Sequence, residues 1–143
     1  MQGNLGNCYF LAALSALVNQ PERIRDLFAG NSLEKNKAGI YKVQLFLQGC
    51  ITTILIDDRV PVNKDGNLAF CRSNNNTLWA ILLEKAWAKV NGSYAMIDGG
   101  TPSFATIHLT GVPSQHIMHE NVKNNENDLW KKLNDFIDRN HNL

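Results

Sequence analysis

The hydrophobic and polar positions of this chain recur with two different periods, which separate helical segments from strands. Apolar residues dominate Cys8 to Val18, and Asn19-Gln20-Pro21 interrupts them, which predicts a first helix with Asn7 as its cap. Pro21 suits the first position of a second, short helix over Pro21 to Phe28, because an N–H has no helical partner there. Apolar residues at helical spacing predict a final amphipathic helix that starts at Asn127 or Asp128.

A long helix from Leu78 to Val90 is the expected core element. Its apolar residues cover one broad face, and Glu84, Lys85 and Lys89 are expected to lie largely elsewhere. Asn74 to Thr77 supply polar side chains for its cap. The tryptophans expected in the core are Trp79, Trp87 and Trp130.

Two strands are predicted between these helices. Ile40 to Leu47 alternates apolar and polar residues in its first half, and Cys50 to Ile56 is rich in β-branched residues. Gln48-Gly49 between them predicts an antiparallel hairpin. Gly99 to Pro113 is rich in turn residues and is expected to be irregular. The sequence therefore predicts an α+β domain in which helices outweigh strands.

The composition excludes some classes of function. The 143 residues fit one domain, and 44% hydrophobic with 19% charged residues is ordinary globular composition. The formal net charge of +1 gives no electrostatic basis for binding nucleic acid or an anionic membrane. Three cysteines without a Cys-x-x-Cys pair favour a reducing compartment. With no signal sequence and no apolar run that could span a bilayer, we expect a cytoplasmic protein.

The candidate chemistry lies at the start of the chain, where Cys8 follows a turn with two glycines and opens the first helix. Free backbone N–H groups at a helix start favour a thiolate, so Cys8 is a candidate nucleophile. Gln2 lies six residues upstream, and its amide with the backbone N–H of Cys8 would form an oxyanion hole. The alternative is a structural cysteine, because Tyr9 to Val18 is apolar enough for a core helix.

The string QGNLGNCYFLAALSAL resembles the active-site segment of calpain-type cysteine proteases. Further segments similar to that family follow in the family's order, so the resemblance covers about Gln2 to Gly111. These segments are Ile56 to Pro61, Lys64 to Gly66, Leu78 to Lys89, Asn91 to Tyr94, Gly99-Gly100 and Thr110-Gly111.

The resemblance implies a protease that hydrolyses peptide bonds of protein substrates through a Cys-His-Asn triad divided between two subdomains. Residues 1–143 would be the first, nucleophile-bearing subdomain, helix-rich with a small antiparallel hairpin. In it Cys8 would be the nucleophile, Gln2 the oxyanion donor and Gly99-Gly100 a loop beside the substrate cleft.

The family's histidine and asparagine stand in segments that read roughly Gly-His-Ala-Tyr and Asn-Pro-Trp-Gly, and neither string is present. His108, predicted in the loop before Thr110-Gly111, matches no catalytic pattern of the family. We therefore expect a fragment truncated at both ends, inactive alone, whose partner is a second subdomain carrying the histidine and asparagine. The alternative is a non-catalytic calpain-like interaction module.

Metal binding is not expected in this chain. The family's core-domain calcium site uses a carboxylate where this chain has Thr77, so calcium regulation would concern only a full-length family member. His116 and His119 are interpreted as surface residues rather than zinc ligands. Two smaller departures are Asn7 and Tyr9, where many relatives have aspartate and tryptophan.

Two other motifs have structural interpretations. Asp57-Asp58 is a carboxylate pair, but adjacent strand residues point to opposite faces, so we expect a strand end with an ion pair to Arg59. The glycine-containing turn Gly3 to Asn7 resembles a phosphate-binding loop only superficially, because the lysine of such loops is missing.

Overall fold

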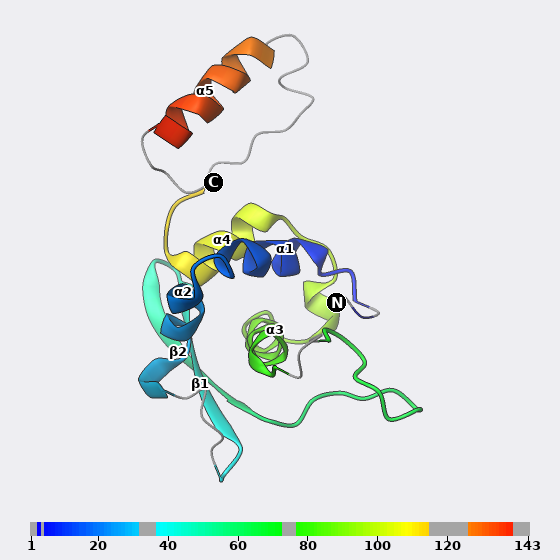
Figure 1. Cartoon of the computed structure of the whole chain (residues 1–143). Coiled ribbons are helices and arrows are strands. Elements are labelled where there is room, and N and C mark those ends of the chain that lie inside the picture. The colour runs from blue at the N-terminus through cyan, green and yellow to red at the C-terminus, as the bar shows by residue number, and fades with distance from the viewer. Residues whose placement is uncertain (1–2, 4, 32–36, 73–76, 115–125, 139–143) are drawn as a thin grey trace.

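The computed structural model describes residues 3, 5–31, 37–72, 77–114 and 126–138, and it has the predicted α+β architecture (Figure 1). Five α-helices, two short 3₁₀ helices and one antiparallel strand pair are present in these residues. In chain order they are α1 (Cys8–Leu17), α2 (Pro21–Asp26), η1 (Ala29–Asn31), β1 (Ile40–Leu47), β2 (Cys50–Asp57), α3 (Trp79–Val90), η2 (Ala95–Ile97), α4 (Pro102–Thr110) and α5 (Glu126–Asp138).

Helix α3 runs through the middle of the folded body. Helices α1 and α4 lie side by side across it, and the hairpin with α2 lies at its flank (Figure 1). Most of α3 is buried, including Leu82, Leu83 and Trp87. A broad face of the helix is buried, so α3 is the core element that the sequence predicts.

The hairpin confirms the predicted strands. Ile40 pairs with Asp57 at one end and Leu47 with Cys50 at the other, which leaves Gln48 and Gly49 as the turn. Both turn residues have positive φ, 52° and 79°, as a tight hairpin turn with the native twist requires. Alternate residues of β1 face the core.

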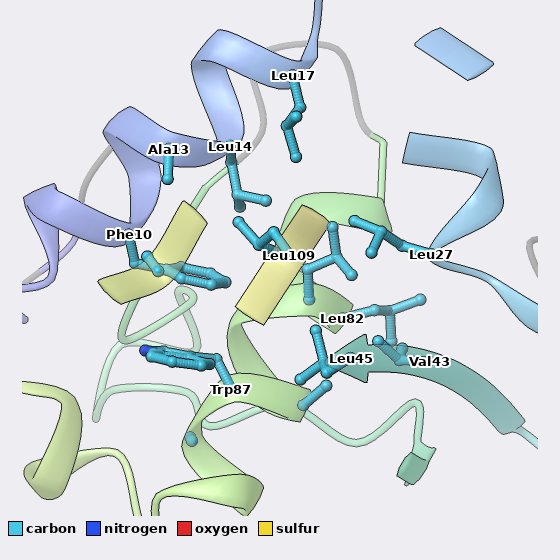
Figure 2. Packing of buried hydrophobic residues seen from close by; sticks show 14 of the residues in the cluster. Phe10, Ala13, Leu14, Leu17, Leu27, Val43, Leu45, Leu82, Trp87 and Leu109 are labelled. Atoms are coloured by element: carbon cyan, nitrogen blue, oxygen red, sulfur yellow. The ribbon is translucent and has the colours of Figure 1, made fainter. Parts of the chain in front are cut away.

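One continuous core joins the helices to the hairpin. The Phe10 ring of α1 stacks on the Trp87 ring of α3 with centroids 5.3 Å apart and planes 8° apart. Leu14, Leu45 and Leu109 converge on the same interior from α1, β1 and α4 (Figure 2). Burial of these side chains is the main force that fixes α1 on α3.

The prediction of irregular structure for Gly99 to Pro113 is wrong, because helix α4 occupies most of it. Pro102 is in the first turn, and Gly111 ends the helix with a φ of 70°. These turn-forming residues are the boundary signals of a short helix, and the residues between them are compatible with a helix. Helix α2 ends at Asp26, two residues earlier than predicted.

The prediction that all three tryptophans lie in the core is correct for Trp87, which is 1% exposed, and wrong for Trp130, which is 65% exposed. Trp79 is partly buried against the core. Trp130 belongs to α5, which lies apart from the folded body in Figure 1. Across the described ranges, no helix has the length and apolar character needed to cross a membrane.

Candidate active site

Cys8 is the first residue of α1, and its side chain is exposed. The residues on either side of it point inward, with Asn7 1% and Tyr9 7% exposed. The interpretation of Cys8 as a buried core cysteine is therefore wrong. The thiol is presented at the surface between two buried neighbours.

The backbone at this point is the start of an α-helix. The first helical hydrogen bonds of α1 run from Phe10 and Leu11 to the carbonyl oxygen of Asn7, at 3.0 and 3.2 Å. The N–H groups of Cys8 and Tyr9 precede these bonds. The first turn contains no acidic side chain. The positive end of the helix dipole is thus available to an anion at Cys8.

The side chain of Asn7 does not cap α1, contrary to the prediction. It makes no cap hydrogen bond, and instead Nδ2 of Asn7 donates to Oε1 of Glu84 at 2.6 Å. Its other atom, Oδ1, is buried without a hydrogen-bond partner among the described residues. Asn7 is therefore an N-cap by its backbone only, and its amide is used for a contact with α3.

Glu84 lies on the buried face of α3, with 1% of its surface exposed, so its predicted place off that face is wrong. Its second oxygen, Oε2, accepts the backbone N–H of Cys71 at 3.1 Å. Burial raises the pKa of the Glu84 carboxyl, and the hydrogen bonds from Asn7 and Cys71 partly oppose that shift. These two donors satisfy both oxygens of a carboxyl group that is buried inside the fold.

The other two cysteines differ sharply from Cys8. Burial, together with the negative charge of Glu84, raises the pKa of the Cys71 thiol to about 11. Cys71 therefore stays protonated near neutral pH and is a poor nucleophile. Cys50 is exposed at the hairpin turn, away from any helix start. The structure provides a buried and an exposed reference thiol for Cys8.

Tyr9, the residue after Cys8, is held in place by two hydrogen bonds of its hydroxyl. Its hydroxyl donates to the carbonyl oxygen of Ile97 at 3.3 Å and accepts the indole N–H of Trp87 at 3.1 Å. Trp87 and Glu84 are three residues apart on α3, so they lie on the same side of that helix. One helix therefore holds both neighbours of Cys8.

The Gly99-Gly100 pair lies directly against the turn that precedes Cys8. Gly6 accepts the N–H of Gly99 at 2.9 Å and donates its own N–H to Oδ1 of Asp98 at 2.7 Å. A Cβ atom on Gly100 would lie 2.6 Å from Cζ of the Tyr9 ring. Only glycine allows this approach, so the loop packs closely beside the helix start.

The acidic pair that the sequence singled out lies at the end of β2, apart from the start of α1. Oδ1 of Asp57 pairs with Lys85 at 2.5 Å, whereas Arg59 contributes only its backbone N–H, at 2.8 Å, so the predicted ion pair to Arg59 is wrong. Lys85 lies within reach because α3 packs on β2, which the sequence pattern does not reveal.

His108 lies in α4 and not in a loop. Its Nδ1 is 2.7 Å from the carbonyl oxygen of Phe104, one turn earlier. Gln2, His116 and His119 lie outside the described residues. No group of three metal-ligating side chains is found in the described ranges.

The sequence analysis did not identify the residues that bind the neighbours of Cys8. The missed residues are Glu84, Asp98 and the Tyr9 hydroxyl. The sequence does contain a signal that Glu84 is buried. Glu84 lies three residues after Ile81 and three before Trp87, which places it on the apolar face of the helix. A single acid inside such a face indicates a buried polar contact.

Comparison with known proteins places these features in a family. The family described as "Calpain family cysteine protease" matches residues 1–143. The chain is 42% identical to human Calpain-12 and 43% identical to the rat Calpain-1 catalytic subunit, each over 112 residues or 77% of the chain. It is 38% identical to human Calpain-14 over 134 residues, 92% of the chain.

The matched region is a small part of these relatives. It spans 15% of human Calpain-12, 16% of the rat Calpain-1 catalytic subunit and 19% of human Calpain-14. The chain therefore corresponds to one segment of much longer proteins.

Proposed function

Because the chain belongs to the calpain family of cysteine proteases, we propose that it is the nucleophile-bearing first subdomain of a protease that hydrolyses peptide bonds in proteins. Cys8 is its nucleophile. The observation that supports this best is the exposed Cys8 side chain at the start of α1, with both neighbours buried and held by α3. The proposed subdomain comprises residues 1–143.

The proposed reaction follows cysteine-protease chemistry. A base removes the thiol proton of Cys8, and the sulfur attacks the peptide carbonyl carbon to form a tetrahedral oxyanion. The amide of Gln2 and the backbone N–H of Cys8 stabilise this oxyanion. Collapse expels the amine, which takes a proton from the protonated base. Water then hydrolyses the thioester and regenerates the thiol.

The base in this proposal is a histidine, oriented by an asparagine, on a second subdomain. The described histidine, His108, is bonded to its own helix, and the family's Gly-His-Ala-Tyr and Asn-Pro-Trp-Gly segments are absent from the 143 residues. We therefore expect this chain alone to form a reactive thiol without turning over peptide substrates. Protein substrates and the second subdomain are the proposed partners.

Two further features belong to the proposal. Thr77 supplies no carboxylate, so we expect this chain to need no calcium for the reactivity of Cys8. Three free cysteines favour a reducing compartment, and hence a cytoplasmic location.

Site-resolved alkylation tests the proposed nucleophile. The full chain is treated with iodoacetamide at pH 7, and the labelling rates of the three cysteines are followed by mass spectrometry. We expect Cys8 to react about tenfold faster than Cys50, because Cys8 is exposed at the positive end of the α1 dipole and Cys50 is not. Cys71 should react slowest because it is buried and its thiol stays protonated. Added calcium should leave the rates unchanged.

The matched control is Cys8→Ser, in which the fast phase should disappear while Cys50 labels as before. Equal, slow labelling of Cys8 and Cys50 would contradict the proposal and favour a non-catalytic interaction module.

A further inference from the structure

A buried polar pair lies directly behind the proposed nucleophile. Asn7 and Glu84 are each 1% exposed, and Nδ2 of Asn7 donates to Oε1 of Glu84 at 2.6 Å. The second carboxylate oxygen accepts the backbone N–H of Cys71 at 3.1 Å. Within the described ranges no cation forms an ion pair with Glu84. Burial of a carboxylate with neutral partners opposes folding, so stability alone does not explain this residue.

The Asn7–Glu84 hydrogen bond lies at the residue where α1 begins. The carbonyl oxygen of Asn7 accepts the first two helical hydrogen bonds of α1, so the position of Asn7 fixes its first turn. The side chain of Asn7 does not cap the helix, and its Oδ1 is buried without a partner among the described residues. Among the described residues, the bond to Glu84 is thus the hydrogen bond that ties this side chain to the rest of the fold.

We propose that Glu84 is a positioning residue for Cys8, which acts through its hydrogen bond to Asn7. The bond crosses 77 residues of sequence and attaches the first turn of α1 to the most buried helix. It thereby sets the direction in which the next side chain, Cys8, leaves the surface. The inference rests on the proposed function, in which Cys8 is the nucleophile.

Two substitutions at position 84 separate the hydrogen bond from the charge. Glu84→Gln keeps an acceptor for the Cys71 N–H, and its amide can donate to Oδ1 of Asn7 once the Asn7 amide turns over. Glu84→Met fills a similar volume without either bond. If hydrogen bonding positions Cys8, the two variants should therefore differ from each other, although neither carries a carboxyl group.

The measurement is the ratio of Cys8 to Cys50 alkylation rates by iodoacetamide in the full chain, with urea unfolding recorded for each variant. We expect Glu84→Gln to stay within about twofold of the wild-type ratio, because the hydrogen bonds are retained. Glu84→Met should lower the ratio by at least about threefold, because the first turn of α1 is no longer fixed. If Glu84→Met does not fold, Asn7→Ser, whose side chain is too short to reach Glu84, should lower the ratio likewise.

A destabilised control distinguishes positioning from a general loss of stability. Val43 is 0% exposed in β1, so Val43→Ala should lower stability without touching the pair, and the ratio should not change. A ratio that survives loss of the Asn7–Glu84 bond, or that falls equally in Val43→Ala, would overturn this inference and leave the proposed function standing. A wild-type Cys8 no faster than Cys50 would contradict the proposed function and this inference with it.

Discussion

At the scale of single residues, the start of α1 is defined by what happens on either side of Cys8. Asn7 and Tyr9 are buried and hydrogen-bonded to different partners, whereas Cys8 is exposed. Glycine at position 100 lets a loop approach the Tyr9 ring more closely than any other residue would allow. The proposed nucleophile is thus held through its neighbours, as a preorganised site requires.

Tyr9→Phe tests one of these contacts. Removal of the hydroxyl leaves the Trp87 indole N–H and the Ile97 carbonyl oxygen without this partner inside the fold. We expect a loss of about 1–2 kcal/mol in the free energy of unfolding, measured by urea denaturation. Tyr41→Phe is the matched control, because Tyr41 is 3% exposed and its hydroxyl makes no hydrogen bond within the described ranges. Equal effects of the two changes would contradict the assigned role of the Tyr9 hydroxyl.

At the scale of elements, α3 connects the candidate site to the hairpin. Its buried face carries Glu84 and Trp87 toward α1. Its Lys85 reaches the end of β2, where Nζ donates to the main-chain and carboxylate oxygens of Asp57 and to the carbonyl oxygen of Arg59. Lys89 donates to the carbonyl oxygen of Leu55 at 2.7 Å. Two lysines thus bind β2 and the segment after it to the helix that contacts both neighbours of Cys8.

The contact between α3 and β2 predicts a specific pH dependence. The hydrogen bond from Lys85 lowers the pKa of the Asp57 carboxyl below 3.8, its ordinary value. A folded-state pKa below the unfolded one contributes stability that is fully present above pH 3.8 and is lost as pH falls through the lower folded value. We therefore expect Asp57→Asn to lower the unfolding free energy at pH 6 and to have little effect near pH 2.

The measurement is urea unfolding of wild type and variant at several pH values. Asp65→Asn is the matched control, since this exposed aspartate forms no ion pair in the part of the chain that the structure describes. A difference between wild type and Asp57→Asn that stays constant down to pH 2 would contradict the role of the Lys85 pair.

At the scale of the whole molecule, the described core is complete without α5. The buried cluster runs from Leu5 to Leu109 and includes residues of α1, α2, β1, β2, α3, η2 and α4. Helix α5 is amphipathic but lies apart from this body, with Trp130 65% exposed (Figure 1). The folded body and α5 are therefore expected to be energetically separate.

Shortening the chain tests this separation. A variant that ends at Ser114 should unfold with a midpoint within about 3 °C of the full chain, because no described core contact is removed. A variant that ends at Gly100 loses Ala105 and Leu109 from the core and should not fold cooperatively. Differential scanning calorimetry measures both. A large loss of stability on removal of residues 115–143 alone would contradict the separation.

The sequence by itself determined the local elements and the chemical candidate. Helix and strand periods predicted α1, the hairpin and α3 to within about a residue at each boundary, because these patterns depend on neighbours along the chain. The order of family-like segments indicated the calpain family and Cys8. Helix α4 was missed because the segment is short and the turn-forming residues at its two ends outweigh its helical pattern. A helix this short depends on packing, here against α1 and β1, which the sequence pattern does not show.

Only the tertiary structure decided how Cys8 is presented. Its partners in space are far away in sequence: Asn7 meets Glu84 across 77 residues, and Tyr9 meets Trp87 across 78. Such contacts depend on which face of α3 packs against α1, and local periodicity does not encode that choice. The same packing brought Lys85 to Asp57 and buried Glu84. The sequence thus supplied a cysteine at a helix start, and packing against α3 left that cysteine exposed and held in place.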